Sequence, residues 1–261
     1  MVPFPLSLET LTTGSGLLLT QVIQLIGVTL SVFLARHFLD KQSLKSLGLR
    51  FHKRSFTDLL AGLIITFFMM TLVYMFSITF GWVDIDFYAW EVDSTTTILS
   101  STGIALMTFI LVGWSEELLS RGYHLQNITS GLNLAWGVFL SSAIFGILHL
   151  ANFNASWEGA FGIFFAGLFF AFSYLRTKQL WLPIGLHIGW NFYEGVLYGF
   201  PVSGLETYSL ISTSVKGPEL WTGGPFGPEG GLILVPAMIL GTVLIYVYTR
   251  NREMTNLKSP N

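Results

Sequence analysis

The chain has 261 residues, of which 52% are hydrophobic and only 11% charged, whereas a soluble domain carries about 25% charged residues. This composition excludes a soluble globular protein and indicates an integral membrane protein. The net charge of −2 excludes a basic nucleic-acid surface, and the lack of cysteine excludes disulfides, thiolate nucleophiles and cysteine-bound metal.

Seven apolar runs are long enough to cross the roughly 30 Å hydrocarbon core of a bilayer as helices. They cover residues 16–35, 59–80, 98–115, 134–151, 160–175, 181–199 and 231–248. Helices are expected because an isolated strand in lipid would leave its backbone polar groups unpaired. The sequence therefore predicts an all-α, polytopic membrane bundle of about seven transmembrane helices. Residues 1–261 are expected to form a single integral membrane domain.

The charges of the connecting segments predict the orientation. Eleven of the 13 basic residues lie in the connections 36–58 and 176–180 and in the tail that follows the last run. The loop 81–97 contains four acidic residues and no basic residue. By the positive-inside rule, the N-terminus is expected outside and the C-terminus in the cytoplasm. Residues 1–13 lack the basic region of a signal peptide, so the first run is expected to remain as a span.

Ionisable side chains within membrane helices are costly and usually face a bundle interior or a wet cavity. The first cluster of them ends the third run, at residues 115–121. In a helix, Glu117 and Arg121 are neighbours on one face, while Glu116 is rotated by about 100°. One carboxylate is therefore expected to pair with the arginine while the other points elsewhere. The structural alternative is a simple ion pair where the helix leaves the membrane.

The other two clusters contain the histidines that lie well inside predicted spans. His149 ends a run that is apolar from residue 134, and the structural alternative is an imidazole bonded to a backbone carbonyl. His187 and Asn191 share one helical face, and their alternative is a polar clamp between helices. Pro183 is expected to kink this last helix and to open space beside His187.

A hairpin would bring the first two clusters together. Glu117 and His149 are equally distant from residue 133, which lies in the polar segment 127–133. If 118–132 continues as helix, an antiparallel hairpin places both residues about 24 Å from its apex. Two carboxylates and two imidazoles from three helices form a plausible set for activating water.

The ordered motifs Glu116-Glu117-x-x-x-Arg121, Phe145-x-x-x-His149 and His187-x-x-x-Asn191 resemble those of the CPBP family. This family includes the type II CAAX prenyl endopeptidases and the bacteriocin-processing or self-immunity (Abi) proteins. The resemblance covers the motif-bearing core at 98–199, and the glycine-rich segment 222–231 is similar to bacterial members. It implies a multi-pass intramembrane endopeptidase with a cavity open toward the cytoplasm. The expected location is the cell membrane, which is the inner membrane in bacteria.

The resemblance also implies roles for the motif residues. Glu116 would be the general base on the attacking water, which His149 helps to position, while His187 and Asn191 would bind the oxyanion. Glu117 would pair with Arg121 and hold the first motif in shape. Phe145 is expected to contribute packing. The desolvation of Glu116 and the shared helical face of His187 and Asn191 agree with these roles.

Zn²⁺ is the expected cofactor. Glu116, His149 and His187 could supply three nitrogen and oxygen ligands and leave the ion one open position. The chain has no H-E-x-x-H helix, so a metal-free mechanism driven by glutamate stays open.

The sequence leaves two other functions open. In a non-proteolytic immunity factor or complex subunit, the polar residues would be structural clamps, and Gln would be tolerated at Glu116. In a transporter they would relay protons, although no inverted repeat is present. The expected partners of a protease are the lipid bilayer and a membrane-associated or hydrophobic peptide or protein, of CAAX type or bacteriocin type, and no nucleic acid.

Overall fold

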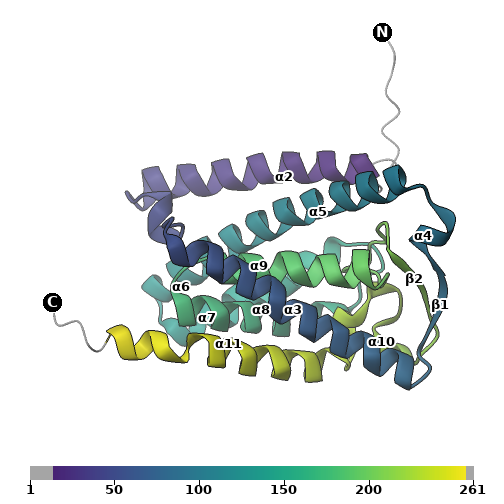
Figure 1. Ribbon diagram of the computed structural model, residues 1–261. Coiled ribbons are helices and arrows are strands. Elements are labelled where there is room, and N and C mark those ends of the chain that lie inside the picture. The colour runs from purple at the N-terminus through teal and green to yellow at the C-terminus, as the bar shows by residue number, and fades with distance from the viewer. Residues whose placement is uncertain (1–13, 257–261) are drawn as a thin grey trace, which may run out of the picture.

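The structure is a computed structural model that describes residues 14–256, with side chains described up to residue 252 (Figure 1). Seven helices of eleven or more residues form a bundle in which they run side by side. They are α2 (Gly14–Leu34), α3 (Lys53–Thr79), α5 (Thr95–Glu117), α7 (Leu134–Leu148), α8 (Trp157–Thr177), α9 (Trp181–Asn191) and α11 (Leu234–Asn256). The short helices are α4 (Ala89–Val92), α6 (Leu125–Gly131) and α10 (Glu219–Thr222).

Six helices in the described part of the chain are long and apolar enough to cross a membrane. They span residues 14–39, 53–79, 95–131, 134–151, 157–177 and 234–252, and they coincide with six of the seven predicted runs. Many large apolar side chains on them are exposed, as expected where a helix contacts lipid. The predicted polytopic helical bundle is therefore confirmed at this level.

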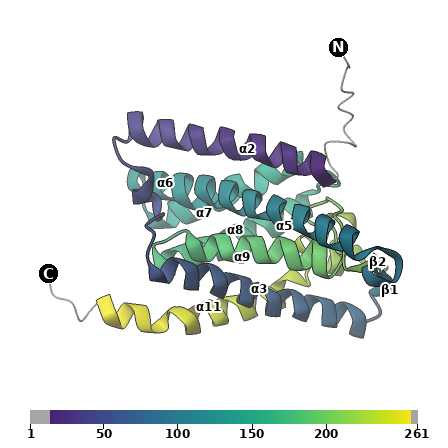
Figure 2. The ribbon, with the colours of Figure 1, turned by 45° about the horizontal axis from the view of Figure 1, so that its top comes forward.

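The remaining predicted run, 181–199, differs from the others. It is helical from Trp181 to Leu197, in α9 followed by the π-helical segment η5 (Phe192–Leu197), and is thus shorter than the other spans. It lies in the middle of the bundle (Figure 2), where every residue of Leu182–Asn191 is buried. The apolar side chains of this run therefore reflect contact with neighbouring helices.

Pro183 does not kink this helix, which corrects the prediction. The helix begins at Trp181, so Pro183 stands in its first turn, where a backbone N–H has no intrahelical partner. The first helical bond runs from Ile184 N to Leu180 O, at 2.9 Å. Pro183 therefore belongs to the first turn of α9, and the space beside His187 does not result from a proline kink.

Glycines allow α9 to approach α3 closely. A Cβ on Gly62 of α3 would lie 2.4 Å from the backbone nitrogen of Leu186, and a Cβ on Gly185 would lie 2.2 Å from Leu59 O. Neither position can hold a larger residue without moving a backbone. Small residues at a helix contact are the usual means of close packing in membranes.

The third predicted span continues into a hairpin, as the sequence analysis required. The π-helical segment η3 (Leu118–His124) connects α5 to α6, and α6 ends at Gly131. Asn133 then caps α7, since its side chain accepts a hydrogen bond from Trp136 N at 3.0 Å. Residues 118–132 therefore carry the helix to the apex, and α5 and α7 run antiparallel.

One end of the bundle is covered by a two-stranded antiparallel sheet (Figure 1). β1 (Val83–Tyr88) pairs with β2 (Ile211–Val215), so that Val83 lies opposite Val215 and Tyr88 opposite Ile211. The sequence analysis assigned the first segment to the loop 81–97, and the second lies between the predicted runs 181–199 and 231–248. Their pairing joins segments more than 100 residues apart, a relationship that local patterns do not reveal.

The basic segments meet at the other end of the bundle. Leu180 N donates to Gly48 O at 2.9 Å, and Arg176 Nε donates to Thr249 Oγ1 at 2.9 Å. Arg252 forms an ion pair with Asp58 at the start of α3. The two basic connections and the described part of the tail thus lie together, as the one-sided charge pattern requires. The cytoplasmic location of this end stays a prediction.

Candidate active site

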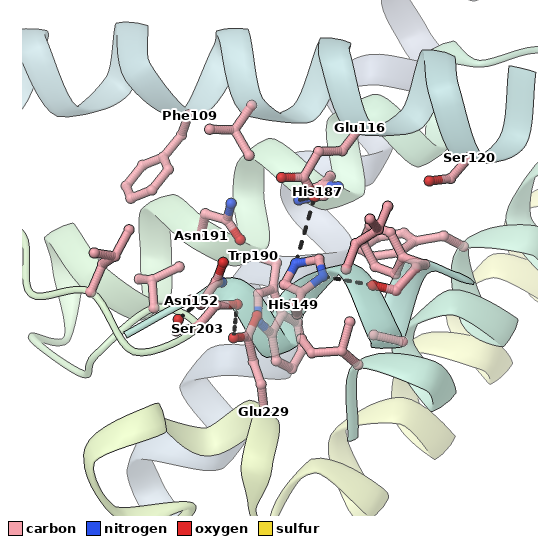
Figure 3. Close-up of a pocket in the computed structure, with 18 of the residues that line it drawn as sticks. Phe109, Glu116, Ser120, His149, Asn152, His187, Trp190, Asn191, Ser203 and Glu229 are labelled. Atoms are coloured by element: carbon pink, nitrogen blue, oxygen red, sulfur yellow. Dashed lines mark hydrogen bonds and ion pairs between the residues drawn. The ribbon is translucent and has the colours of Figure 1, made fainter. Parts of the chain in front are cut away.

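A cavity of about 350 Å³ lies inside the bundle, between α2, α5, α7, α8, α9 and the loop before α11 (Figure 3). Most of its lining is apolar, and its polar side chains include four of the six predicted catalytic residues. These are Glu116, His149, His187 and Asn191. The two remaining predicted residues, Glu117 and Arg121, lie behind this wall.

Glu117 and Arg121 form a buried ion pair. Arg121 Nη1 donates to Glu117 Oε1 at 2.8 Å, and Arg121 Nη2 donates to the backbone oxygen of Gly167 at 3.1 Å. The guanidinium also lies over the rings of Phe145 and Phe170, with centroid distances of 4.3 and 4.9 Å. The predicted pairing is present, and it joins the first motif to α7 and α8.

The same carboxylate oxygen orients His187. Its Nδ1 lies 2.9 Å from Glu117 Oε1. Because this oxygen belongs to a carboxylate paired with Arg121, the histidine is the donor. Phe170 stacks on the imidazole ring at 5.0 Å, with an angle of 8° between the planes. The ring is therefore fixed, and Nε2 is the nitrogen that faces the cavity.

His149 is fixed in the same way by its own helix. It stands where α7 passes into the 3₁₀ turn η4 (His149–Ala151), and its Nδ1 lies 2.7 Å from the carbonyl oxygen of Phe145. A carbonyl only accepts, so Nδ1 donates. This is the bond expected of a purely structural imidazole, yet it leaves Nε2 free to face the cavity. The ring of Phe145 packs edge-on against this imidazole at 4.7 Å.

Glu116 points away from the ion pair, as its 100° rotation from Glu117 requires. Its Oε2 lies 3.7 Å from Nε2 of His149 and 3.7 Å from Nε2 of His187. These separations exceed hydrogen-bond length. Glu116 Oε2 is buried and has no hydrogen-bond partner among the described residues. With both Nδ1 atoms donating, each neutral imidazole directs a lone pair toward a carboxylate oxygen.

Three acceptor atoms thus face one another across a short gap. None of the three acceptors receives a hydrogen bond from a described residue. A water molecule, a proton or a cation placed among them would supply a donor or a positive charge. In zinc sites, a ligating histidine typically donates its other N–H to a carboxylate or carbonyl, which is the pattern seen at His187 and His149. The donor set therefore fits Zn²⁺ in its chemistry.

Glu116 Oε2 lies farther from the two histidine Nε2 atoms than two ligands of the same zinc ion lie from each other. Within residues 14–256, no group of three or more His, Asp or Glu side chains is close enough to hold a metal ion. Two ligands of a tetrahedral zinc stand about 3.3 Å apart, given bond lengths of about 2.0–2.1 Å. The 3.7 Å separations at Glu116 would have to shorten slightly on binding.

Asn191 completes the predicted set. It lies four residues after His187 on α9, is 6% exposed, and directs its amide into the cavity (Figure 3). Its side chain forms no hydrogen bond with any described residue. A free amide that faces such a cavity is suited to donate to an oxyanion.

Sequence analysis missed Glu229, which lines the cavity on the side away from Glu116 (Figure 3). Its carboxylate accepts hydrogen bonds from Trp190 Nε1 at 3.1 Å and from the hydroxyl of Ser203. A Cβ on Gly162 of α8 would lie 1.8 Å from the backbone oxygen of Glu229, so the loop rests directly on that helix. An acidic residue among glycines before the last span was the available signal.

A second buried acid, Glu194, lies near this loop outside the cavity. It is fully buried, and neither of its carboxylate oxygens has a hydrogen-bond partner in the described part of the chain. A Cβ on Gly227 would lie 3.5 Å from Glu194 Oε1. Glu194 therefore belongs to the contact between η5 and the glycine-rich segment.

Comparison with known proteins supports the family resemblance that the motifs indicated. No curated protein and no solved structure matched the chain. A family model described as "Type II CAAX prenyl endopeptidase Rce1-like" matches residues 98–193. That segment runs from α5 to the start of η5 and contains the three motifs that line or support the cavity. Residues 98–193 thus carry the signature of the type II CAAX prenyl endopeptidase family that the motifs predicted.

Proposed function

We propose that this chain is an intramembrane endopeptidase that hydrolyses a peptide bond in a membrane-associated or hydrophobic peptide. The observation that carries the proposal is the unpartnered Oε2 of Glu116, which faces Nε2 of both His149 and His187. A carboxylate placed this way can take a proton from a water held among the three side chains. The family match over residues 98–193 supports a peptidase.

The reaction follows from this arrangement. Glu116 removes a proton from the water while the water oxygen attacks the scissile carbonyl carbon. Asn191 donates its amide N–H to the oxyanion that forms. The C–N bond then breaks, and the proton held by Glu116 passes to the leaving amine, which restores the carboxylate. Without a metal, His149 would position the water directly through Nε2, since its Nδ1 is bonded to Phe145 O.

We propose Zn²⁺ as the cofactor, which Glu116 Oε2 and Nε2 of His149 and His187 would hold. With the ion bound, the second oxygen of Glu116, Oε1, would be the atom that accepts the proton. When bound, the ion lowers the pKa of its water and polarises the carbonyl. The tautomers support this choice, because His187 with a neutral ring has no hydrogen on Nε2 to give to an oxyanion. A doubly protonated His187 is the metal-free alternative, and the two differ in zinc content.

The alternative hypothesis, that the polar residues are structural clamps between helices, applies to residues other than Glu116. Glu117, Arg121 and His187 already form a closed network that joins α5, α8 and α9. Glu116 takes no part in it and has no hydrogen bond through Oε2. A purely structural role therefore explains Glu117 and leaves Glu116 unexplained.

The test uses purified protein in detergent and an internally quenched peptide that ends in a CAAX sequence, with and without a farnesyl group. An unmodified apolar bacteriocin-like peptide serves as the third substrate. We expect cleavage of at least one peptide by wild type, and a loss of about 10²–10⁴-fold in Glu116→Gln. Equal cleavage by wild type and Glu116→Gln would overturn the proposal. Which peptide is cleaved assigns the substrate class, including whether a prenyl group is required.

A further inference from the structure

Helix α2, the first helix of the described residues, brings two amide side chains to the cavity. The mechanism does not use these amides. Leu17, Gln21 and Gln24 of α2 line the cavity, and their spacing of four and three residues places them on one helical face. Other positions of the same helix face outward, since Ile23 is 63% exposed and Ile26 is 59% exposed. Gln21 is half-buried, whereas Gln24 lines the cavity and is also exposed, so both amides reach the site from a helix whose other side chains are mostly apolar.

Neither glutamine is needed to attach α2 to the bundle. The bond that α2 receives from α5 runs from Trp114 Nε1 to Thr29 Oγ1, at 3.3 Å. Gln21 Oε1 is buried and has no hydrogen-bond partner among the described residues. Gln24 forms no side-chain bond within that part of the chain either. Polar side chains in membrane helices normally find a partner on a neighbouring helix. The missing partner here is on the cavity side.

The chemistry of an amide identifies that partner. An amide side chain carries donors and an acceptor, and it does not titrate. A peptide that enters a largely apolar cavity loses the water bound to its backbone N–H and C=O groups. A glutamine can replace both, because its NH₂ donates to a peptide carbonyl while its Oε1 accepts from a peptide N–H. Lipid acyl chains offer neither group.

We propose that Gln21 and Gln24 bind the backbone of the peptide substrate along the α2 wall of the cavity. Glu116 and Thr108 of α5 line the same cavity, so a peptide held by α2 lies across the carboxylate that activates water. Asn191 reaches the cavity from α9. The substrate is thus bound between the amides of α2 and the groups that act on its carbonyl. This inference rests on the proposed function.

The kinetic test compares Gln21→Leu, Gln24→Leu and the double variant with Ile23→Leu, a control on the exposed face of the same helix. The substrate is the quenched peptide that wild type cleaves. We expect KM to rise about tenfold to hundredfold in the double variant, with kcat within about twofold of wild type. Ile23→Leu should match wild type in both constants. An unchanged KM in the double variant would overturn the proposal.

A scan of the substrate backbone separates direct binding from a change in the shape of the cavity. Each peptide N–H is replaced in turn by N-methyl, which removes one donor. At the bonds that the glutamines contact, N-methylation should raise KM for wild type and have no further effect in the leucine variants. Penalties that are the same in wild type and both variants at every position would contradict direct contact.

A binding measurement distinguishes failure of this inference from failure of the proposed function. Benzoylphenylalanine is placed at position 17, which lines the cavity beside Gln21, or at the exposed position 23, in the Glu116→Gln variant, and is irradiated with each fluorescent peptide in detergent. Crosslinking from 17 and not from 23, lost when Gln21→Leu and Gln24→Leu are added, supports the inference, even if wild type cleaves no peptide and the proposed function fails. Cleavage by wild type without crosslinking from 17, or with crosslinking that the leucine substitutions leave unchanged, overturns the inference alone. The absence of both overturns both.

Discussion

His187 lies between two adjacent glutamates and uses a different ring nitrogen toward each. Its Nδ1 is 2.9 Å from Glu117 Oε1, whereas its Nε2 is 3.7 Å from Glu116 Oε2. One imidazole thus connects a carboxylate neutralised by Arg121 with a carboxylate that faces the cavity. The identical side chains of residues 116 and 117 are therefore expected to respond differently to the same substitution.

The Glu117→Gln variant should lose folding stability as well as activity. It leaves Arg121 as a buried charge without its counter-ion, and breaking a buried ion pair costs about 3–5 kcal/mol. Glu116→Gln removes no protein hydrogen bond of Oε2, so its thermal unfolding in detergent should stay close to that of wild type. Thermal unfolding of both variants is the measurement. Equal destabilisation would show that Glu116 is a structural residue.

The Asn191→Ala variant should lower kcat more than it raises KM. Its amide has no partner in the described protein, and a lost oxyanion donor typically costs about 10²–10³ in kcat. Steady-state cleavage of the quenched peptide measures both constants. A rise in KM alone would assign Asn191 to substrate binding.

Zinc content should depend on His149. Wild type purified in detergent should contain close to one equivalent of zinc, and His149→Ala should lose it, because a ligand is removed. Zinc measured by mass spectrometry, before and after dialysis against a chelator, provides the result. Chelation should abolish peptide cleavage, and added Zn²⁺ should restore it. A folded, active and zinc-free wild type would establish the metal-free mechanism with doubly protonated His187.

The contact between α3 and α9 should be sensitive to a single methyl group. Gly62→Ala places a Cβ 2.4 Å from a backbone nitrogen of α9, and overpacking typically costs about 1–3 kcal/mol. The matched control is Gly103→Ala on α5, where the added Cβ meets nothing within 4 Å. The control should be neutral or slightly stabilising, because alanine favours helix. Thermal unfolding of both variants in detergent gives the comparison.

Glu229 should make stability depend on pH. Burial raises the pKa of its carboxyl above the ordinary value of 4.5, against the opposing hydrogen bond from Ser203. The folded state therefore binds this proton more tightly than the unfolded state. As pH rises from about 4.5 through the raised pKa, wild type should lose stability relative to Glu229→Gln. Above that pKa, the difference should become constant. Thermal unfolding at a series of pH values measures this, and parallel curves would contradict it.

The division of roles between Glu116 and Glu117 was predictable because helix geometry fixes it locally. The distances from Glu117 and His149 to residue 133 likewise predicted the hairpin, since a helix has a constant rise. The π-helical segments η3 and η5 were not visible in the sequence, although both adjoin site residues. The tautomers of His149 and His187 depend on acceptors whose placement needs the folded chain.

Other parts of the site depend on contacts between distant segments. Glu229 reaches the cavity because its loop folds onto Gly162 and Trp190, far away in the sequence. Gln21 gave no signal, since a single amide in an apolar helix does not reveal which neighbour it faces. The pairing of β1 with β2 has the same origin. Local periodicity indicates which face of an element is apolar, and packing then determines what that face meets.

The central position of α9 has a consequence for how the protein is assembled. Residues Leu182–Asn191 are buried by other helices, so in the finished bundle His187 and Asn191 are shielded from lipid. During synthesis, however, α3, α5 and α8 precede this segment, while α11 and the loop with Glu229 follow it. The earlier helices must therefore receive α9 and its polar groups before the last helix is made. Glu229 and Met238 line the cavity, so a chain that ends before residue 228 would lack this part of the cavity wall.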